Sequence, residues 1–134
     1  DARARLGEIL HDRVLACHPD ATPARLDKER GRFSCAPCVV AVVVHATKNH
    51  KVPEIEQLLS GGAVCMNLLH AAHQAGFGAQ WLTGFAAYDR VVLAALGVAP
   101  EERVVGFIHI GSRHCDPQER ERPDPADLLD VATP

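Results

Sequence analysis

The chain contains 134 residues, of which 47% are apolar and 23% charged, and its net charge is −3. This length and composition indicate one domain with a real core and exclude a mainly disordered protein. The acidic balance and the aromatic share of 4% argue against a basic or base-stacking surface for nucleic acid. We therefore expect a single domain over residues 1–134 that has no nucleic acid partner.

Two helices are predicted before the first strand. Residues 3–17 repeat apolar side chains at the spacing of a helix with one buried face. Because the chain opens with residues typical of a helix interior, we expect further residues upstream of Asp1 in the native protein. A second, polar helix is predicted from Pro23 to Arg30, with Thr22 as its N-cap.

The centre of the chain predicts a strand followed by a long helix. The β-branched run 38–45 is typical of a strand that is covered on both faces. From residue 54 to about residue 75, apolar side chains circle most of a helix, which predicts burial inside the protein or between subunits. Gly61 and Gly62 each cost this helix about 1 kcal/mol relative to alanine. Such glycines are tolerated more easily where a backbone or a ligand approaches closely.

The second half predicts two further strands, one more helix and a tail. Residues 80–84 form a short strand or turn, residues 88–96 a helix, and residues 104–110 a clear strand. The polar, proline-containing residues 113–134 are predicted to be an extended arm that lies on another surface. Its expected apolar anchors are Leu128, Leu129 and Val131. The predicted fold class is α+β.

The five cysteines predict reduced thiols more readily than disulfides. An odd count without a secretory signal favours a cytoplasmic protein. Cys35 and Cys38 have the spacing of a redox pair or half a zinc site, but they lead into a strand and do not open a helix. His114 and Cys115 could complete a zinc site only if the tail folds back. We favour structural thiols and predict no metal site. No apolar run reaches the roughly 18–20 residues of a membrane span.

Spacing rules identify no catalytic acid, base or nucleophile. His70 and His73 share a helix face but lack a third ligand, and the serines lack a nucleophile-elbow context. The glycines of 76–79 follow a helix instead of opening one, which excludes a dinucleotide fingerprint. The protein is therefore either a binding protein or an enzyme whose cofactor carries the chemistry.

Short segments follow one another along the chain in a recognisable order: His50–Gln57, Gly61–Val64, Asn67–Leu69, Ala71–Ala72, Gly76–Ala79, Trp81–Phe85 and Val105–Gly111. This ordered series resembles the nitroreductase family and, within it, the short YdjA-like branch. The resemblance covers nearly the whole chain, from residue 1 to about residue 128. It implies a small, mainly antiparallel sheet flanked by helices, with the long central helix at a homodimer interface and the arm 113–134 around the other subunit.

The resemblance also implies a reaction and its cofactors. Family membership implies an FMN-dependent oxidoreductase that transfers hydride from NAD(P)H through the flavin to a nitroaromatic, a quinone or a similar small-molecule acceptor. Because the flavin would carry the chemistry, no catalytic side chain is expected.

The resemblance implies flavin contacts at Trp81, Leu82, Thr83 and Gly84. The backbone near Thr83 and Gly84 would meet the N5 and O4 edge of the ring, since a glycine permits close approach. Trp81 has an alternative interpretation as a core aromatic residue.

Two further sets of cofactor residues are implied more weakly. Arg120 and Arg122 could reach the FMN phosphate, although solvated tail arginines are the alternative. The segment expected to contact nicotinamide consists of Ala71, Ala72, His73, Gln74, Ala75 and Gly76.

The chain departs from the family pattern at its start. The arginine-rich segment that holds the FMN phosphate and one strand of the sheet have no counterpart here, so an exposed sheet edge is expected. The alternative function is therefore a non-catalytic flavin-binding or dimerisation remnant. A third hypothesis is a small zinc module that uses Cys35, Cys38 and Cys115.

Overall fold

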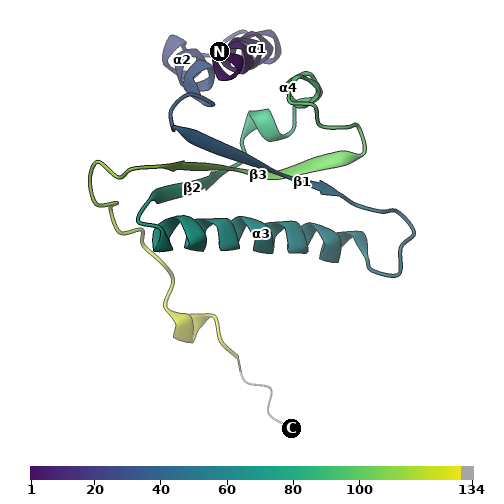
Figure 1. Cartoon of the computed structure of the whole chain (residues 1–134), viewed down its shortest axis with the longest axis vertical. Coiled ribbons are helices and arrows are strands. Elements are labelled where there is room, and N and C mark those ends of the chain that lie inside the picture. Colours follow the sequence, from purple (N-terminus) through teal and green to yellow (C-terminus); the bar gives the residue numbers. More distant parts are fainter. Residues whose placement is uncertain (131–134) are drawn as a thin grey trace.

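A central antiparallel sheet with helices on both faces organises the chain in the computed structural model, which describes residues 1–130. Within these residues the sheet has three strands: β1 (Cys38–His45), β2 (Gly78–Leu82) and β3 (Glu102–Gly111). Their order is β1-β3-β2, with β3 antiparallel to both neighbours. Helix α3 covers one face, and α1, α2 and α4 lie beyond the other (Figure 1). The predicted α+β class is confirmed, and β1 and β2 are the sheet edges.

The first two helices pack closely against each other. Helix α1 (Ala2–Cys17) buries Leu10 and Val14, and α2 spans Pro23–Gly31 with Thr22 as its N-cap, as predicted. A Cβ atom at Gly7 would lie 2.0 Å from the carbonyl oxygen of Arg30, so a glycine is needed where the two backbones meet.

Helix α3 (Glu54–Gln74) lies along the sheet and approaches it closely at its glycines. A Cβ atom at Gly61 would lie 2.4 Å from Cγ2 of Val44, whereas one at Gly62 would lie 3.7 Å from the Trp81 ring. Gly61 therefore leaves room for the valine side chains of β1 and β3 against the helix, whereas the sequence predicts the approach of a backbone or a ligand.

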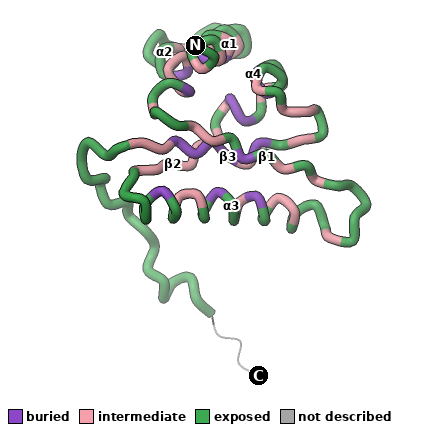
Figure 2. The backbone as a smooth tube through the Cα atoms, in the orientation of Figure 1, coloured by how far each residue is buried: buried purple, intermediate pink, exposed green. Residues whose placement is uncertain are grey.

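Helix α3 exposes both apolar and polar side chains on the positions that the sheet leaves uncovered (Figure 2). Ile55, Leu59 and Met66 lie along one flank and keep between 44% and 64% of their accessible surface, whereas Val64 lies on the opposite flank, beside β1. The outermost positions between the flanks are polar and include Glu56, Asn67 and His70. Of the two predicted alternatives, burial inside the protein does not hold for these positions, because the sheet covers only the face that carries Gly61 and Cys65. Burial between subunits stays a prediction.

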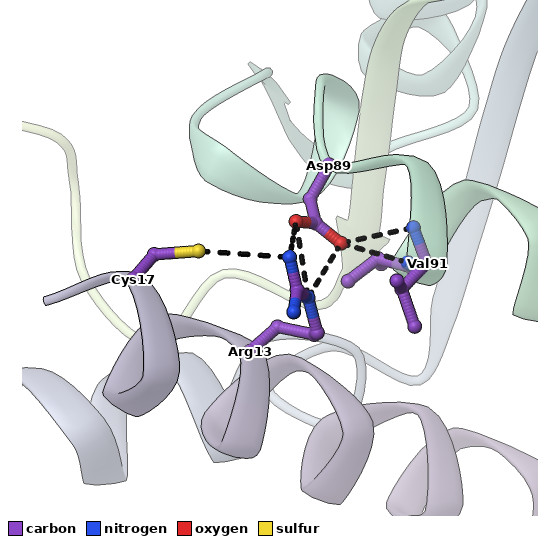
Figure 3. A network of polar contacts seen from close by, with 5 residues as sticks. Arg13, Cys17, Asp89 and Val91 are labelled. Atoms are coloured by element: carbon purple, nitrogen blue, oxygen red, sulfur yellow. Dashed lines mark hydrogen bonds and ion pairs between the residues drawn. The ribbon is translucent and has the colours of Figure 1, made fainter.

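The helix predicted over 88–96 is shorter than expected. A 3₁₀ turn covers Phe85–Ala87, and α4 spans only Arg90–Ala95. The Asp89 carboxylate accepts hydrogen bonds from the backbone N–H groups of Val91 and Val92, so the helix begins after Asp89. The same carboxylate binds Arg13 of α1 and joins α4 to that helix (Figure 3).

The described part of the arm is extended and exposed. Residues 113–130 contain only the short 3₁₀ turn Pro125–Asp127, and they leave the body on the side of α3 (Figure 1). Leu128 and Leu129 are 69% and 76% exposed, so they do not anchor the arm on its own chain. The third predicted anchor, Val131, lies outside the described residues.

Candidate cofactor-binding site

The Trp81 side chain packs between the sheet and α3. Its indole Nε1 donates a hydrogen bond to the carbonyl oxygen of Val105 at 3.1 Å. A Cβ atom at Gly106 would lie 2.0 Å from the same nitrogen, so the indole lies directly on the β3 backbone. The side chain thus matches the alternative interpretation of Trp81 as a core aromatic residue, and it ties β2 to β3.

Leu82, one residue later on β2, points to the opposite face of the sheet because side chains alternate along a strand. There it lines a cavity of about 970 Å³ at the ends of β2 and β3. Cys35, which precedes β1, and His109 of β3 line the same cavity, which continues to Cys115 at the start of the arm.

The loop after β2 offers open backbone beside this cavity. Thr83 is half-buried and Gly84 is exposed, with a φ of 68° that favours glycine. A Cβ atom at Gly84 would lie 3.4 Å from a guanidinium nitrogen of Arg32, so the loop lies against that side chain. Arg32 therefore occupies the side of Gly84 on which a side chain would lie, and the predicted flavin contact at Thr83 and Gly84 stays a prediction.

An ion pair fixes Arg32 beside this loop. Its Nε and Nη2 donate to the two carboxylate oxygens of Glu29 at 2.6 and 2.7 Å, and both side chains are about nine-tenths buried. The hydrogen bonds that Arg32 donates to Glu29 raise the pKa of Arg32. The charge of Arg32 is thus balanced by Glu29, so the pair fits a structural role better than the binding of a phosphate.

A thiol and an imidazole meet on the cavity wall. His109 is only 6% exposed, and its Nδ1 lies 3.5 Å from Sγ of Cys35. The Cys35 thiol also donates a hydrogen bond to the carbonyl oxygen of Arg32, with Sγ 3.1 Å from that oxygen. His109 Nε2 is buried without a hydrogen-bond partner. Burial, and then the positive charge of Arg32, lower the pKa of His109.

The lowered pKa of His109 predicts a loss of stability in mild acid. The neutral ring is favoured in the folded chain, so its contribution is present above pH 6.5 and is lost as the pH falls below that value. We expect the urea midpoint to decrease between about pH 7.5 and pH 5.5. His109→Gln should reduce this decrease, and an unchanged pH dependence in that variant would contradict the assignment.

The other predicted cofactor residues lie apart from the loop. Residues 71–76 form the exposed end of α3, except for buried Ala72, and His73 alone among them lines the cavity. Arg120 and Arg122 lie on the exposed arm, beyond Pro117, the last arm residue at the cavity. Arg122 pairs with Glu119 and donates to the Arg120 carbonyl. The structure therefore brings together Leu82 and His73, but leaves the two arginines outside.

The zinc hypothesis lacks a ligand set. Among residues 1–130, no three His, Cys, Asp or Glu side chains gather where they could hold a metal ion. Cys35 and Cys115 share the cavity wall, and every cysteine in this range is a free thiol.

None of the helices in residues 1–130 has the length and hydropathy to cross a membrane.

Sequence reasoning missed the polar contacts around the loop. The pairing of Glu29 with Arg32 and of Cys35 with His109 was not predicted, because the second pair is 74 residues apart in the chain. One signal was available: His109 stands in an otherwise apolar strand, where a polar side chain needs a partner.

The three-stranded sheet with a long helix on one face defines an α+β domain, and comparison with known proteins places this domain in a family. The profile of the nitroreductase family matches residues 1–112. The chain belongs to the nitroreductase family.

Individual relatives extend this result. The chain is 33% identical over 112 residues to YdjA of Escherichia coli K12, which is provisionally named an NAD(P)H nitroreductase, covering 84% of this chain and 60% of that protein. A similarly named protein of Haemophilus influenzae is 33% identical over 94 residues, covering 69% of this chain and 51% of its own. The chain thus spans about half to three fifths of the length of these relatives.

Solved structures share the fold. A nitroreductase-like family protein from Bacillus cereus superimposes with a TM-score of 0.72 at 21% identity, over 94% of this chain and 67% of that one. The enone reductase CLA-ER superimposes with a TM-score of 0.53 at 20% identity, over 96% of this chain and 58% of that one. The predicted family and fold are therefore confirmed.

Proposed function

We propose that this chain binds FMN and serves an oxidoreductase that transfers hydride from NAD(P)H to a nitroaromatic, a quinone or a similar acceptor. The observation that carries the proposal is a cavity of about 970 Å³ lined by Leu82, two residues before the exposed Gly84, in a chain of the nitroreductase family. Bound FMN would supply the hydride chemistry, so the protein need only bind, orient and exclude water.

Each residue from Trp81 to Gly84 would have its own part in binding and orienting FMN. Gly84 is exposed, and backbone groups of Thr83 and Gly84 would hydrogen-bond to the ring edge on the side away from Arg32. Leu82 would offer an apolar wall, while Trp81 would hold β2 in place through its bond to Val105. Residues 71–76 are the proposed nicotinamide contact, and Arg120 and Arg122 the proposed phosphate contacts.

Gly84→Ala tests the proposed flavin contact. We expect weaker FMN binding in a fluorescence titration, because the added Cβ lies at the loop and an alanine strains at φ 68°. Gly97→Ala is the matched control, since Gly97 has a φ of 80°, with open space around its Cβ position. Both variants should lose about 1–2 kcal/mol of stability, but only the first should lose FMN affinity. Equal FMN affinity in the two variants would contradict the contact.

We also propose that the chain forms a homodimer through the outward face of α3. The exposed side chains Ile55, Leu59 and Met66 lie along one flank of the helix, and such an exposed apolar stripe is typical of a subunit interface. The exposed arm would then lie on the partner, where Leu128 and Leu129 could be covered.

Leu59→Glu is expected to shift the protein to the monomer in analytical ultracentrifugation, because it would bury a carboxylate at the interface. The control is Val91→Glu on α4, because the Val91 side chain is 49% exposed. Leu93→Glu on the same helix is unsuitable, since Leu93 is buried. A wild-type chain that is monomeric at all concentrations would overturn the proposed dimer.

A non-catalytic remnant is the second candidate function. It is favoured by the Glu29–Arg32 pair, which occupies the arginine nearest the loop and leaves it poorly suited to a phosphate. This candidate predicts a dimer that shows neither flavin absorbance after FMN addition nor NAD(P)H oxidation with quinones or nitroaromatics. Flavin-dependent NAD(P)H oxidation would exclude it.

A further inference from the structure

Cys35 and His109 form a thiol–imidazole pair that the proposed flavin chemistry does not use. The pair joins the segment before β1 to the middle of the sheet, with 3.5 Å between Sγ and Nδ1. Arg3 holds this segment in place by donating to the carbonyl oxygens of Ala36 and Pro37 at 2.8 and 3.0 Å. The thiol is exposed and the imidazole buried, so an incoming molecule meets the sulfur first.

We propose that Cys35 is the nucleophile of a covalent modification site that takes α,β-unsaturated carbonyl compounds, quinones included, from the cavity beside β2. His109 accepts the thiol proton and orients the sulfur. The choice of this compound class rests on the proposed function, whose acceptors include quinones.

The proposed step is an addition that balances without an oxidant or a reductant. The S–H of Cys35 turns from the Arg32 carbonyl toward Nδ1 of His109, the S–H bond breaks, and the proton goes to Nδ1. The sulfur lone pair forms a C–S bond to the β-carbon, and the π electrons move to the carbonyl oxygen as an enolate. The imidazolium then returns the proton to the enolate, which leaves a thioether and a neutral imidazole.

The surroundings of His109 support its role. Only 6% of the His109 surface is exposed, and its Nε2 has no hydrogen-bond partner among the described residues. Because burial and Arg32 lower the pKa of His109, the resting ring is neutral, and the imidazolium exists only until the proton moves on to the enolate. Glu29 is the other charged group of this cluster, and it is paired with Arg32.

The cavity suits a flat, carbonyl-bearing molecule. Its wall beside Cys35 is apolar at Ala36, Pro37 and Leu82. Gly111 lets Pro37 lie against β3, since a Cβ atom there would be 2.9 Å from the proline ring. Arg113 also lines the cavity and is a donor that suits a carbonyl or an enolate oxygen.

The test compares thiols within one chain. The full chain, without FMN or NAD(P)H, is treated at neutral pH with substoichiometric N-ethylmaleimide, and the adducts are quantified by peptide mass mapping over time. The exposed thiols Cys17, Cys38 and Cys115 are internal comparators, and buried Cys65 reports unfolding. We expect Cys35 to react about tenfold faster than the comparators or more. Limiting 1,4-benzoquinone should modify Cys35 first as well.

His109→Gln removes the proton acceptor and should slow Cys35 to the rate of Cys38, while the other exposed thiols react as before. Equal rates at Cys35 and Cys38 in the native wild type, or an unchanged Cys35 rate in the variant, would overturn the proposal. If Cys65 reacts in the variant, the variant has unfolded, and the test then rests on the reaction rates of the wild-type chain. The Cys35-to-Cys38 ratio must then fall to about one in urea, and a ratio that persists in urea overturns the proposal. Because no flavin is present, the result is independent of FMN binding.

Discussion

Gly106→Ala should lower the free energy of unfolding by about 3 kcal/mol, in a urea titration followed by tryptophan fluorescence. The new Cβ would lie 2.0 Å from Nε1 and 2.3 Å from Cδ1 of Trp81, distances that no side chain tolerates. The indole must move off β3, which costs about 1–3 kcal/mol for overpacking and about 1 kcal/mol for the lost bond to the Val105 carbonyl.

Gly62→Ala provides the matched control, because it faces the same indole from the other side. Its Cβ would lie 3.7 Å from the ring, an ordinary contact, and it sits within helix α3. Alanine should therefore leave stability unchanged or raise it by up to about 1 kcal/mol. If both substitutions shift the midpoint equally, the close packing of Trp81 on Gly106 is wrong.

The same experiment bears on the candidate site. Trp81 and Leu82 are adjacent, so displacing the indole should also disturb the loop at Thr83 and Gly84. In the Trp81→Leu background, Gly106→Ala should cost much less than in the wild type, since the clash disappears. Additive losses would mean that the two residues do not act through their contact.

Asp89→Ala is expected to cost about 2–3 kcal/mol, measured by the same titration. The carboxylate is 8% exposed and accepts from Val91 and Val92 at 3.0 and 3.1 Å as the N-cap of α4. It also accepts from Nε and Nη2 of Arg13 at 3.2 and 2.9 Å, which fixes α4 to α1 (Figure 3). Alanine removes the cap, worth about 1 kcal/mol, and the hydrogen bonds from Arg13, which account for the rest of the loss.

Asp89→Asn separates the two contributions. The amide oxygen of asparagine can still cap α4, but the pair with Arg13 loses its charge. The free energy of unfolding should therefore fall less in Asp89→Asn than in Asp89→Ala. The hydrogen bonds from Arg13 lower the pKa of Asp89, so its stabilisation is present above about pH 4 and is lost as the pH falls through the lowered value. The asparagine variant should therefore lose less stability than the wild type between about pH 5 and pH 2. Parallel losses in both proteins would contradict this assignment.

Local patterns predicted most elements, because their signals lie within one segment. The β-branched run of β1, the apolar periodicity of α1 and the Thr22–Pro23 start of α2 each appear in the structure near the predicted bounds. The start of α4 was misplaced, because the Asp89 cap is a single polar side chain beside a weak periodicity.

The sequence by itself determined the fold class and the family, since the ordered segments from His50 to Gly111 carry both. It also determined which residues to examine at the loop, Trp81 to Gly84. The directions of these side chains follow only from the fold: alternation along β2 turns Trp81 toward α3 and Leu82 toward the cavity. Likewise, only folding brings Cys35 to His109 and Arg13 to Asp89, because contacts between residues more than 70 positions apart leave no local pattern in a single chain.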